Sequence, residues 1–137
     1  MNYEVKVSYC LGLEGAEKKH TENLFIRCEL FAEAEEKAYK YVESQGGDMT
    51  DVKAIKRSNV TELIEEEIPD ARWHKVTISK KYIINEETEK ETEMKYYLLL
   101  MAENTAEANE RAIEHMKQVM YDYSITKIEE TKFSEVI

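Results

Sequence analysis

The chain contains no apolar run that approaches the roughly 18–20 residues needed to span a bilayer. Its first residues, Met-Asn-Tyr-Glu-Val-Lys, lack the basic region and the apolar stretch of a secretory signal. Only two cysteines occur, Cys10 and Cys28, and we expect reduced thiols that pack as small apolar residues on neighbouring strands. These absences predict a cytoplasmic protein that does not bind a membrane.

Positive charge is also scarce, because 19 Lys and Arg stand against 29 Asp and Glu, which gives a formal net charge of −10. Such a balance disfavours loose, non-specific attraction to DNA or to anionic lipid. The apolar content of 42% and the nine tyrosines are sufficient for a packed interior. A length of 137 residues suits one domain, or two small halves that share a core.

The usual signatures of catalysis and metal binding are missing from the sequence. There is no glycine-rich phosphate loop, no cysteine pair at zinc spacing and no His-Glu-x-x-His motif. The histidines at 20, 74 and 115 fall in a predicted loop, strand and helix, without ligand spacing between them. The glutamates of the predicted helices are interpreted as solvated surface rather than acid–base groups. We therefore expect no enzyme, no cofactor and no metal, although a single sequence does not reveal a site assembled across a dimer.

A repeated segment dominates the sequence. Phe31–Val42 and Thr105–Met116 align without a gap, with five identities in twelve positions, and Lys37 recurs as Arg111. The segments Val52–Ile64 and Ile125–Ile137 also match, at a shift of 73 residues. These matches predict a chain built twice.

Hydrophobic periodicity assigns the elements within each half. Strands are predicted at 3–9, 23–29, 52–64, 73–82, 95–101 and 124–137, and helices at 31–45 and from 105 onwards. Each half then reads β-β-α-β, and a charged linker with the only proline, Glu65–Asp70, separates the halves. The predicted fold is α+β: a tandem duplication of this unit, with six strands and two helices about a pseudo-twofold axis. The predicted repeats are residues 1–67 and 68–137, packed as one compact domain.

Several short motifs together resemble a known family. They are Ile55-Lys56-Arg57 with Glu62-Leu63, Arg72-Trp73, the Glu-rich segment Asn85–Glu93, Asp122-Tyr123-Ser124-Ile125, and Glu130-Thr131. The chain resembles the small uncharacterised proteins of Bacteroidetes and their phages called domain of unknown function 4494. It departs from that pattern at His74, where an aromatic residue is expected, and in ending at Ile137. The resemblance implies a phage or mobile-element context, and so the cytoplasm of a bacterial host cell, and no particular activity.

Basic residues gather in two segments that contain no acid. One lies between Asp51 and Glu62, the other between Asp70 and Glu86. If the two strands were neighbours, their exposed face would suit a ligand with phosphates and bases, because cations meet phosphate and rings stack on bases. The simpler alternative is ordinary solvent-side strand residues that protect an edge, with Trp73 in the core. The candidate ligand-binding residues are Lys53, Lys56, Arg57, Arg72, Trp73, Lys75, Lys80 and Lys81.

The sequence leaves three functions open. The first is a non-enzymatic accessory protein of a phage or mobile element that binds single-stranded nucleic acid through basic sheet faces. The second is an anti-defence factor that sequesters a nucleotide signal or blocks a host protein. The third is a structural or assembly protein that docks through an exposed strand edge. Homodimerisation is compatible with all three, since the predicted topology leaves two open edges.

Overall fold

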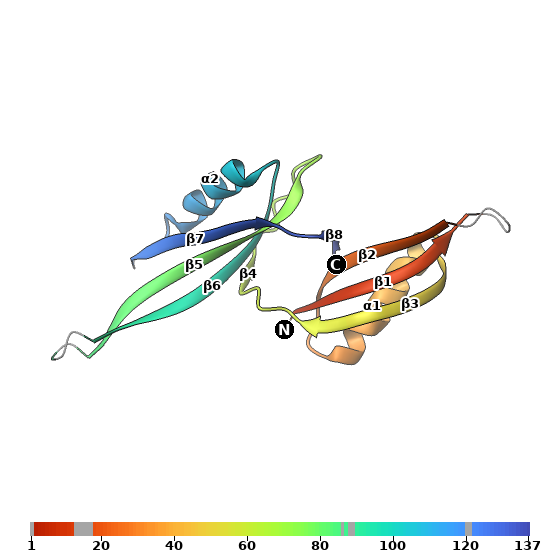
Figure 1. The fold of residues 1–137 in the computed structure, drawn as a ribbon, viewed down its shortest axis with the longest axis horizontal. Helices are drawn as coiled ribbons and strands as arrows, with labels where there is room; N and C mark the ends of the chain where they lie inside the picture. Colours follow the sequence, from red (N-terminus) through yellow and green to blue (C-terminus); the bar gives the residue numbers. More distant parts are fainter. Residues whose placement is uncertain (1, 13–17, 86, 88–89, 120–121) are drawn as a thin grey trace. The chain divides into compact units, whose positions relative to one another are not determined.

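The computed structural model describes residues 2–12, 18–85, 87, 90–119 and 122–137. Within them the chain forms eight strands and two helices, and the strands make two four-stranded sheets. Contacts divide the chain into two compact units: unit 1 is Met1–Asn59 with Lys132–Ile137, and unit 2 is Val60–Thr131. Each unit holds one sheet and one helix, and Figure 1 shows each helix lying along one face of its sheet.

Unit 1 contains sheet A, in which the strands follow the order β3-β1-β2-β8. β1 pairs antiparallel with β2 and with β3, whereas β8 pairs parallel with β2. The elements of unit 1 are β1 (Asn2–Leu11), β2 (Lys18–Arg27), α1 (Phe31–Ser44), β3 (Asp48–Arg57) and β8 (Phe133–Val136).

Unit 2 contains sheet B, in which the strands follow the order β4-β6-β5-β7. β5 pairs antiparallel with β6 and with β7, whereas β4 pairs parallel with β6. The elements of unit 2 are β4 (Glu62–Leu63), β5 (Arg72–Asn85), β6 (Lys90–Ala102), α2 (Thr105–Met116) and β7 (Tyr123–Glu130).

The core of unit 1 lies between α1 and one face of sheet A. Alternate residues of β1, from Tyr3 to Tyr9, point towards α1, whose buried residues are Ala34, Ala38 and Val42. Spacings of four place these three on one side of the helix, and the two alanines allow a close approach to the sheet. After the helix ends, Gly46 adopts a φ of 75°, and a Cβ on Gly47 would lie 2.6 Å from Tyr9.

The core of unit 2 is a separate cluster between α2 and sheet B. Val76 and Ile78 of β5 and Leu98 and Leu100 of β6 face the helix, and all four are fully buried. The helix contributes Ala108, Ala112 and Met116. Each sheet therefore packs against its own helix, and the packing of the two halves as one compact domain stays a prediction.

The predicted fold of six strands in a tandem β-β-α-β duplication is wrong, because the described residues form eight strands in two sheets. The long strand expected at 52–64 is two strands, β3 in sheet A and β4 in sheet B. The strand expected at 124–137 is likewise β7 in sheet B and β8 in sheet A. Each sheet thus takes its fourth strand from outside the predicted unit, and the pseudo-twofold pair of self-contained units is not what the chain forms. The result is a mostly β protein with two helices.

Candidate functional site

The eight predicted ligand-binding residues are divided between the two sheets. Lys53, Lys56 and Arg57 lie on β3 of sheet A, and the other five lie on β5 of sheet B. The two strands belong to different units. The two strands therefore do not pair in one sheet, and the candidate residues have to be considered sheet by sheet.

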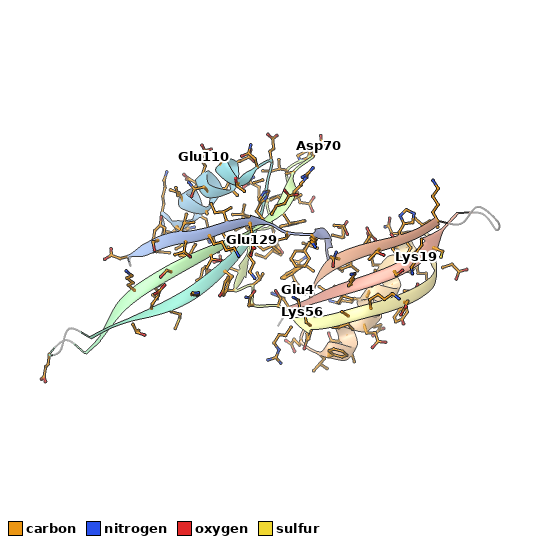
Figure 2. All side chains as sticks on the ribbon, viewed as in Figure 1. Glu4, Lys19, Lys56, Asp70, Glu110 and Glu129 are labelled. Atoms are coloured by element: carbon orange, nitrogen blue, oxygen red, sulfur yellow. The ribbon has the colours of Figure 1, made fainter. Side chains whose placement is uncertain are left out.

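The lysines of β3 lie next to acids of their own sheet. Lys53 Nζ lies 2.6 Å from a carboxylate oxygen of Asp51, and this contact lowers the pKa of the Asp51 carboxyl. Lys56 is opposite Glu4 in the register, with Nζ 3.8 Å from its carboxylate (Figure 2). Arg57 is opposite Tyr3 and so falls on the other face, towards α1. Most of the positive charge predicted for β3 is therefore balanced locally.

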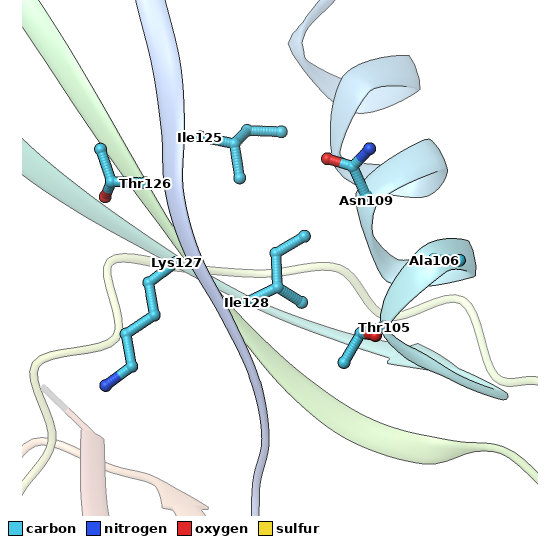
Figure 3. Close-up of a pocket in the computed structure, with 7 residues that line it drawn as sticks. All are labelled: Thr105, Ala106, Asn109, Ile125, Thr126, Lys127 and Ile128. Atoms are coloured by element: carbon cyan, nitrogen blue, oxygen red, sulfur yellow. The ribbon is translucent and has the colours of Figure 1, made fainter.

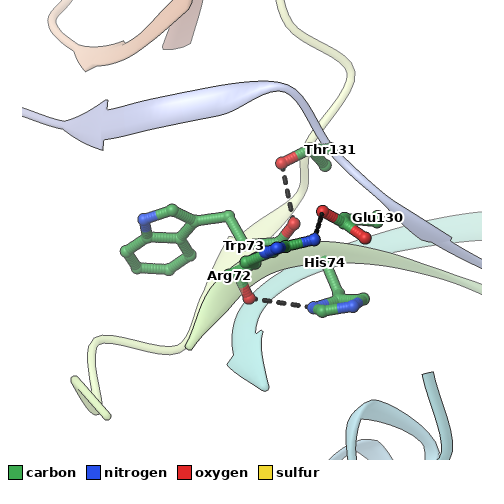
Figure 4. A network of polar contacts seen from close by, with 5 residues as sticks. All are labelled: Arg72, Trp73, His74, Glu130 and Thr131. Carbon is green, nitrogen blue, oxygen red and sulfur yellow. Dashed lines mark hydrogen bonds and ion pairs between the residues drawn. The ribbon is translucent and has the colours of Figure 1, made fainter. Parts of the chain in front are cut away.

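The five candidates on β5 alternate between its faces. Trp73, Lys75 and Lys81 point away from α2, because they alternate with the core residues of the strand. Arg72 and Lys80 have the opposite parity and lie on the side of α2. Arg72 Nη1 lies 2.8 Å from Glu130 Oε1, so its charge is also paired (Figure 4).

Polar contacts hold the start of β5 to the end of β7 and fix the orientation of His74 within β5. The Thr131 hydroxyl donates to the carbonyl oxygen of Trp73 at 2.8 Å, and His74 Nδ1 lies 2.8 Å from the carbonyl oxygen of Arg72. Trp73 and His74 leave the strand in opposite directions (Figure 4). Trp73 is only 8% exposed, so its ring is a structural element of this end of sheet B rather than an open stacking platform.

Register brings further lysines onto the face of sheet B that points away from α2. Lys95 of β6 is opposite Ser79, and Lys127 of β7 is opposite Thr77. We call this face the lysine face. It consists of the outward-facing residues of β5 between positions 73 and 81 and of their partners on β6 and β7. It carries four lysines and two glutamates. The charged members are Lys75, Lys81, Lys95, Lys127, Glu93 and Glu129.

The contacts of the lysine face leave positive charge at its surface. Lys75 Nζ lies 4.8 Å from the centre of the Tyr97 ring, which is a cation–π geometry. Glu93 accepts a hydrogen bond from the Ser79 hydroxyl. Lys127 Nζ lies 3.2 Å from Glu129 and is therefore paired. Lys81, which is opposite Glu93 in the register, and Lys95 are exposed. The sequence alone did not select Lys95, Tyr97 and Lys127, because only the strand register places them beside β5.

Two partly buried carboxylates, one in each unit, are held by tyrosine hydroxyls. In unit 1, Glu22 accepts hydrogen bonds from Tyr9 at 2.6 Å and from Tyr41 at 3.2 Å. Burial, together with Glu22, raises the pKa of Tyr9 to about 12, and the pKa of Tyr41 is raised for the same reasons. In unit 2, Glu62 accepts a hydrogen bond from Tyr96 and lies 3.1 Å from His115 Nε2. The contacts of these carboxylates lie within each unit, so we assign them a structural role.

A hollow lies between α2 and the edge strand β7, and it is lined by both elements (Figure 3). Its volume is about 440 Å³. The helix contributes the short side chains of Thr105, Ala106 and Asn109, and the strand contributes residues 125–128. Asn104 caps this end of α2 by accepting a hydrogen bond from the Glu107 N–H at 2.8 Å, which fixes the position of the first helical turn.

The described part of the chain contains no group of three or more His, Cys, Asp or Glu that could hold a metal ion. Neither helix in the same residues is long and apolar enough to cross a membrane.

No curated protein and no solved structure shows a significant match to the chain. A family model does match, and the match covers residues 1–137. The motifs that suggested this family, from Ile55-Lys56-Arg57 on β3 to Glu130-Thr131 at the end of β7, are distributed over both units. The chain belongs to the family described as Domain of unknown function (DUF4494).

Proposed function

We propose that the protein is a non-catalytic binding protein that takes single-stranded nucleic acid on the lysine face of sheet B. The observation that carries this proposal is the separation of charge within unit 2. Four lysines and two glutamates lie on the lysine face. The acids Glu107, Glu110 and Glu114 are carried by α2, on the other side of the sheet.

The arrangement suits an anionic strand with bases better than it suits a rigid duplex. Lys81 and Lys95 are exposed and stand at one end of the face, where they can meet phosphates. Tyr97 offers the only aromatic ring among the partly exposed described residues of this face, and Lys75 covers it. A cation–π contact at an exposed site contributes only about 0.5–1 kcal/mol, so a stacked base can replace it and leave the ammonium to bind phosphate.

The test is a fluorescence anisotropy titration of a labelled single-stranded oligonucleotide at low salt. We expect wild-type protein to bind, with an affinity that falls as salt rises. The double variant Lys81→Glu with Lys95→Glu should bind at least about tenfold more weakly, because two phosphate contacts are lost. The slope of log affinity against log salt should become shallower by about 0.7 for each contact removed.

A matched control reverses Lys53 and Lys56 of β3 to glutamate. It makes the same change in net charge on the other sheet, where both lysines are balanced by Asp51 and Glu4. We expect this control to bind nearly as well as the wild type. Equal losses in the two double variants would mean that net charge alone decides binding. The absence of wild-type binding at about 10 μM protein, or binding that ignores salt, would refute the proposal.

A further inference from the structure

β7 has an open hydrogen-bonding edge. It is the last strand of sheet B and pairs with β5 on one side only, and no strand of the described residues lies on its other side. Its outer backbone groups run along eight residues, Tyr123–Glu130. An open edge of this kind is a template for pairing with another strand. The opposite edge of sheet B, at β6, already accepts β4 as an added strand.

The hollow beside β7 leaves room for the side chains of an added strand. It lies on the α2 side of the sheet, where Ile125 and Ile128 of β7 meet Ala106 and Asn109 of the helix (Figure 3). Ile125 and Ile128 are only partly buried in the core of unit 2. An apolar side chain on a neighbouring strand would fill the hollow and complete the burial of both isoleucines.

The sequence of β7 is complementary to itself in one antiparallel register. Ile128 faces α2, and Lys127 and Glu129 flank it on the lysine face. A second copy of β7 centred on Ile128 places Lys127 opposite Glu129 of the partner subunit, and Glu129 opposite Lys127 of the partner subunit. A register centred on Lys127 sets two lysines against each other. A register centred between Thr126 and Lys127 also matches the faces, but it aligns no opposite charges.

From this complementarity we infer that the protein forms a homodimer through antiparallel pairing of β7 with β7 of a second copy, centred on Ile128. The contact is isologous, as expected of a twofold dimer, and joins the two B sheets edge to edge. Ile128 of each subunit enters the space between α2 and β7 of the other. The short ladder makes the dimer weak and dependent on concentration. Because both subunits keep the same orientation of their sheet faces, the two lysine faces would lie on one side of the joined sheet.

The test is sedimentation equilibrium of the full chain between about 10 and 500 μM, a range suited to weak association. We expect a monomer–dimer equilibrium for the wild type. Lys127→Glu and Glu129→Lys should each weaken the dimer at least about tenfold, because each sets like charges opposite each other twice. The doubly exchanged variant, Lys127→Glu with Glu129→Lys, should recover the wild-type dissociation constant within about threefold.

An equimolar mixture of the two single variants gives a sharper result. Each is expected to be monomeric alone, and the mixture should form heterodimers, because every glutamate then meets a lysine. Lys40→Glu on the outer side of α1 is the control for charge reversal, and circular dichroism confirms that each variant is folded. A single monomer mass across the whole range would overturn the inference. So would single variants that dimerise like the wild type, or a mixture that stays monomeric.

Discussion

Sheets A and B have the same strand arrangement but carry charge differently. Each has three antiparallel strands and a short fourth strand added in parallel. In sheet A the lysines of β3 lie against Asp51 and Glu4. In sheet B, Lys81 and Lys95 are exposed and Glu93 is held by Ser79. The comparison shows that the core positions decide the fold, while the residues of the opposite face can diverge in chemistry without changing it.

The largest effect on stability is expected in sheet A, where Phe25 lies next to the fourth strand, β8. Phe25 of β2 is fully buried, and its ring lies 5.5 Å from that of Phe133 in β8. Phe25→Ala should lower the free energy of unfolding by about 3–5 kcal/mol, because it leaves a cavity next to the ring of Phe133. Denaturant unfolding measures this loss. Phe31→Ala is the control: that ring is 53% exposed, so a comparable loss there would contradict the assignment.

The two tyrosine-bound carboxylates should differ in their contribution. Glu22→Ala removes the acceptor of two tyrosine hydroxyls and should cost about 2 kcal/mol. Glu62→Ala should cost about 1 kcal/mol, because the Glu62 side chain is 41% exposed and water can replace its partners. Urea unfolding of both variants gives the comparison. Equal losses in the free energy of unfolding would show that the two tyrosine hydroxyls bonded to Glu22 stabilise the protein no more than the partners of Glu62 do.

Alkaline pH should weaken unit 1 through Tyr9. Its pKa is raised to about 12 in the folded protein, against about 10 for an unperturbed tyrosine. The folded state therefore holds its proton more tightly, and the resulting stability is present below pH 10 and is lost as pH rises towards 12. The free energy of unfolding of the wild type should fall more steeply between pH 10 and 12 than that of Tyr9→Phe. Parallel slopes would contradict the raised pKa.

The helix starts should show the smallest difference. Asn104 caps α2 with its side chain, whereas Leu30, at the same position before α1, makes no such bond and is 61% exposed. Asn104→Ala should cost about 1 kcal/mol. Leu30→Asn should stabilise the protein by about 0.5–1 kcal/mol, because the backbone there is already extended. Thermal unfolding checks both signs, and a loss on Leu30→Asn would show that Leu30 packs against something important.

Local patterns predicted much of the secondary structure. Alternation located β1, β2, β5 and β6, and spacings of three and four located both helices and their buried alanines. The cap of the second helix is local as well, because Asn104 accepts from the N–H of Glu107, three residues further on. These features depend on neighbours in sequence, which is why periodicity is sufficient to find them.

The division of the last strand of each half could not be read from periodicity. β4 has only two residues, too few to show an alternation of their own, and it pairs with Leu98 and Leu99, more than thirty positions away. β8 pairs with β2 across more than a hundred positions. The repeated helix residues reflect a shared way of packing a helix on a sheet, and they do not reveal which sheet a later strand joins.

The residues of the candidate site are brought together by both local and long-range features of the fold. Lys75 and Lys81 do share an outward face, because strand parity is a local property. Lys95 and Lys127 join them through long-range register, and the partners of Lys56 and Arg72 come from strands distant in sequence. A segment that contains no acid in the sequence can therefore still lie beside acids from other strands in the folded protein.

The most direct test of the account is an amide chemical-shift titration of ¹⁵N-labelled protein with a single-stranded oligonucleotide. The account predicts that the shifts concentrate on β5 and β6, near Lys75, Lys81, Lys95 and Tyr97, and that β1 and β3 change little. Shifts centred on sheet A, or the absence of any change on the lysine face at saturating oligonucleotide, would contradict it.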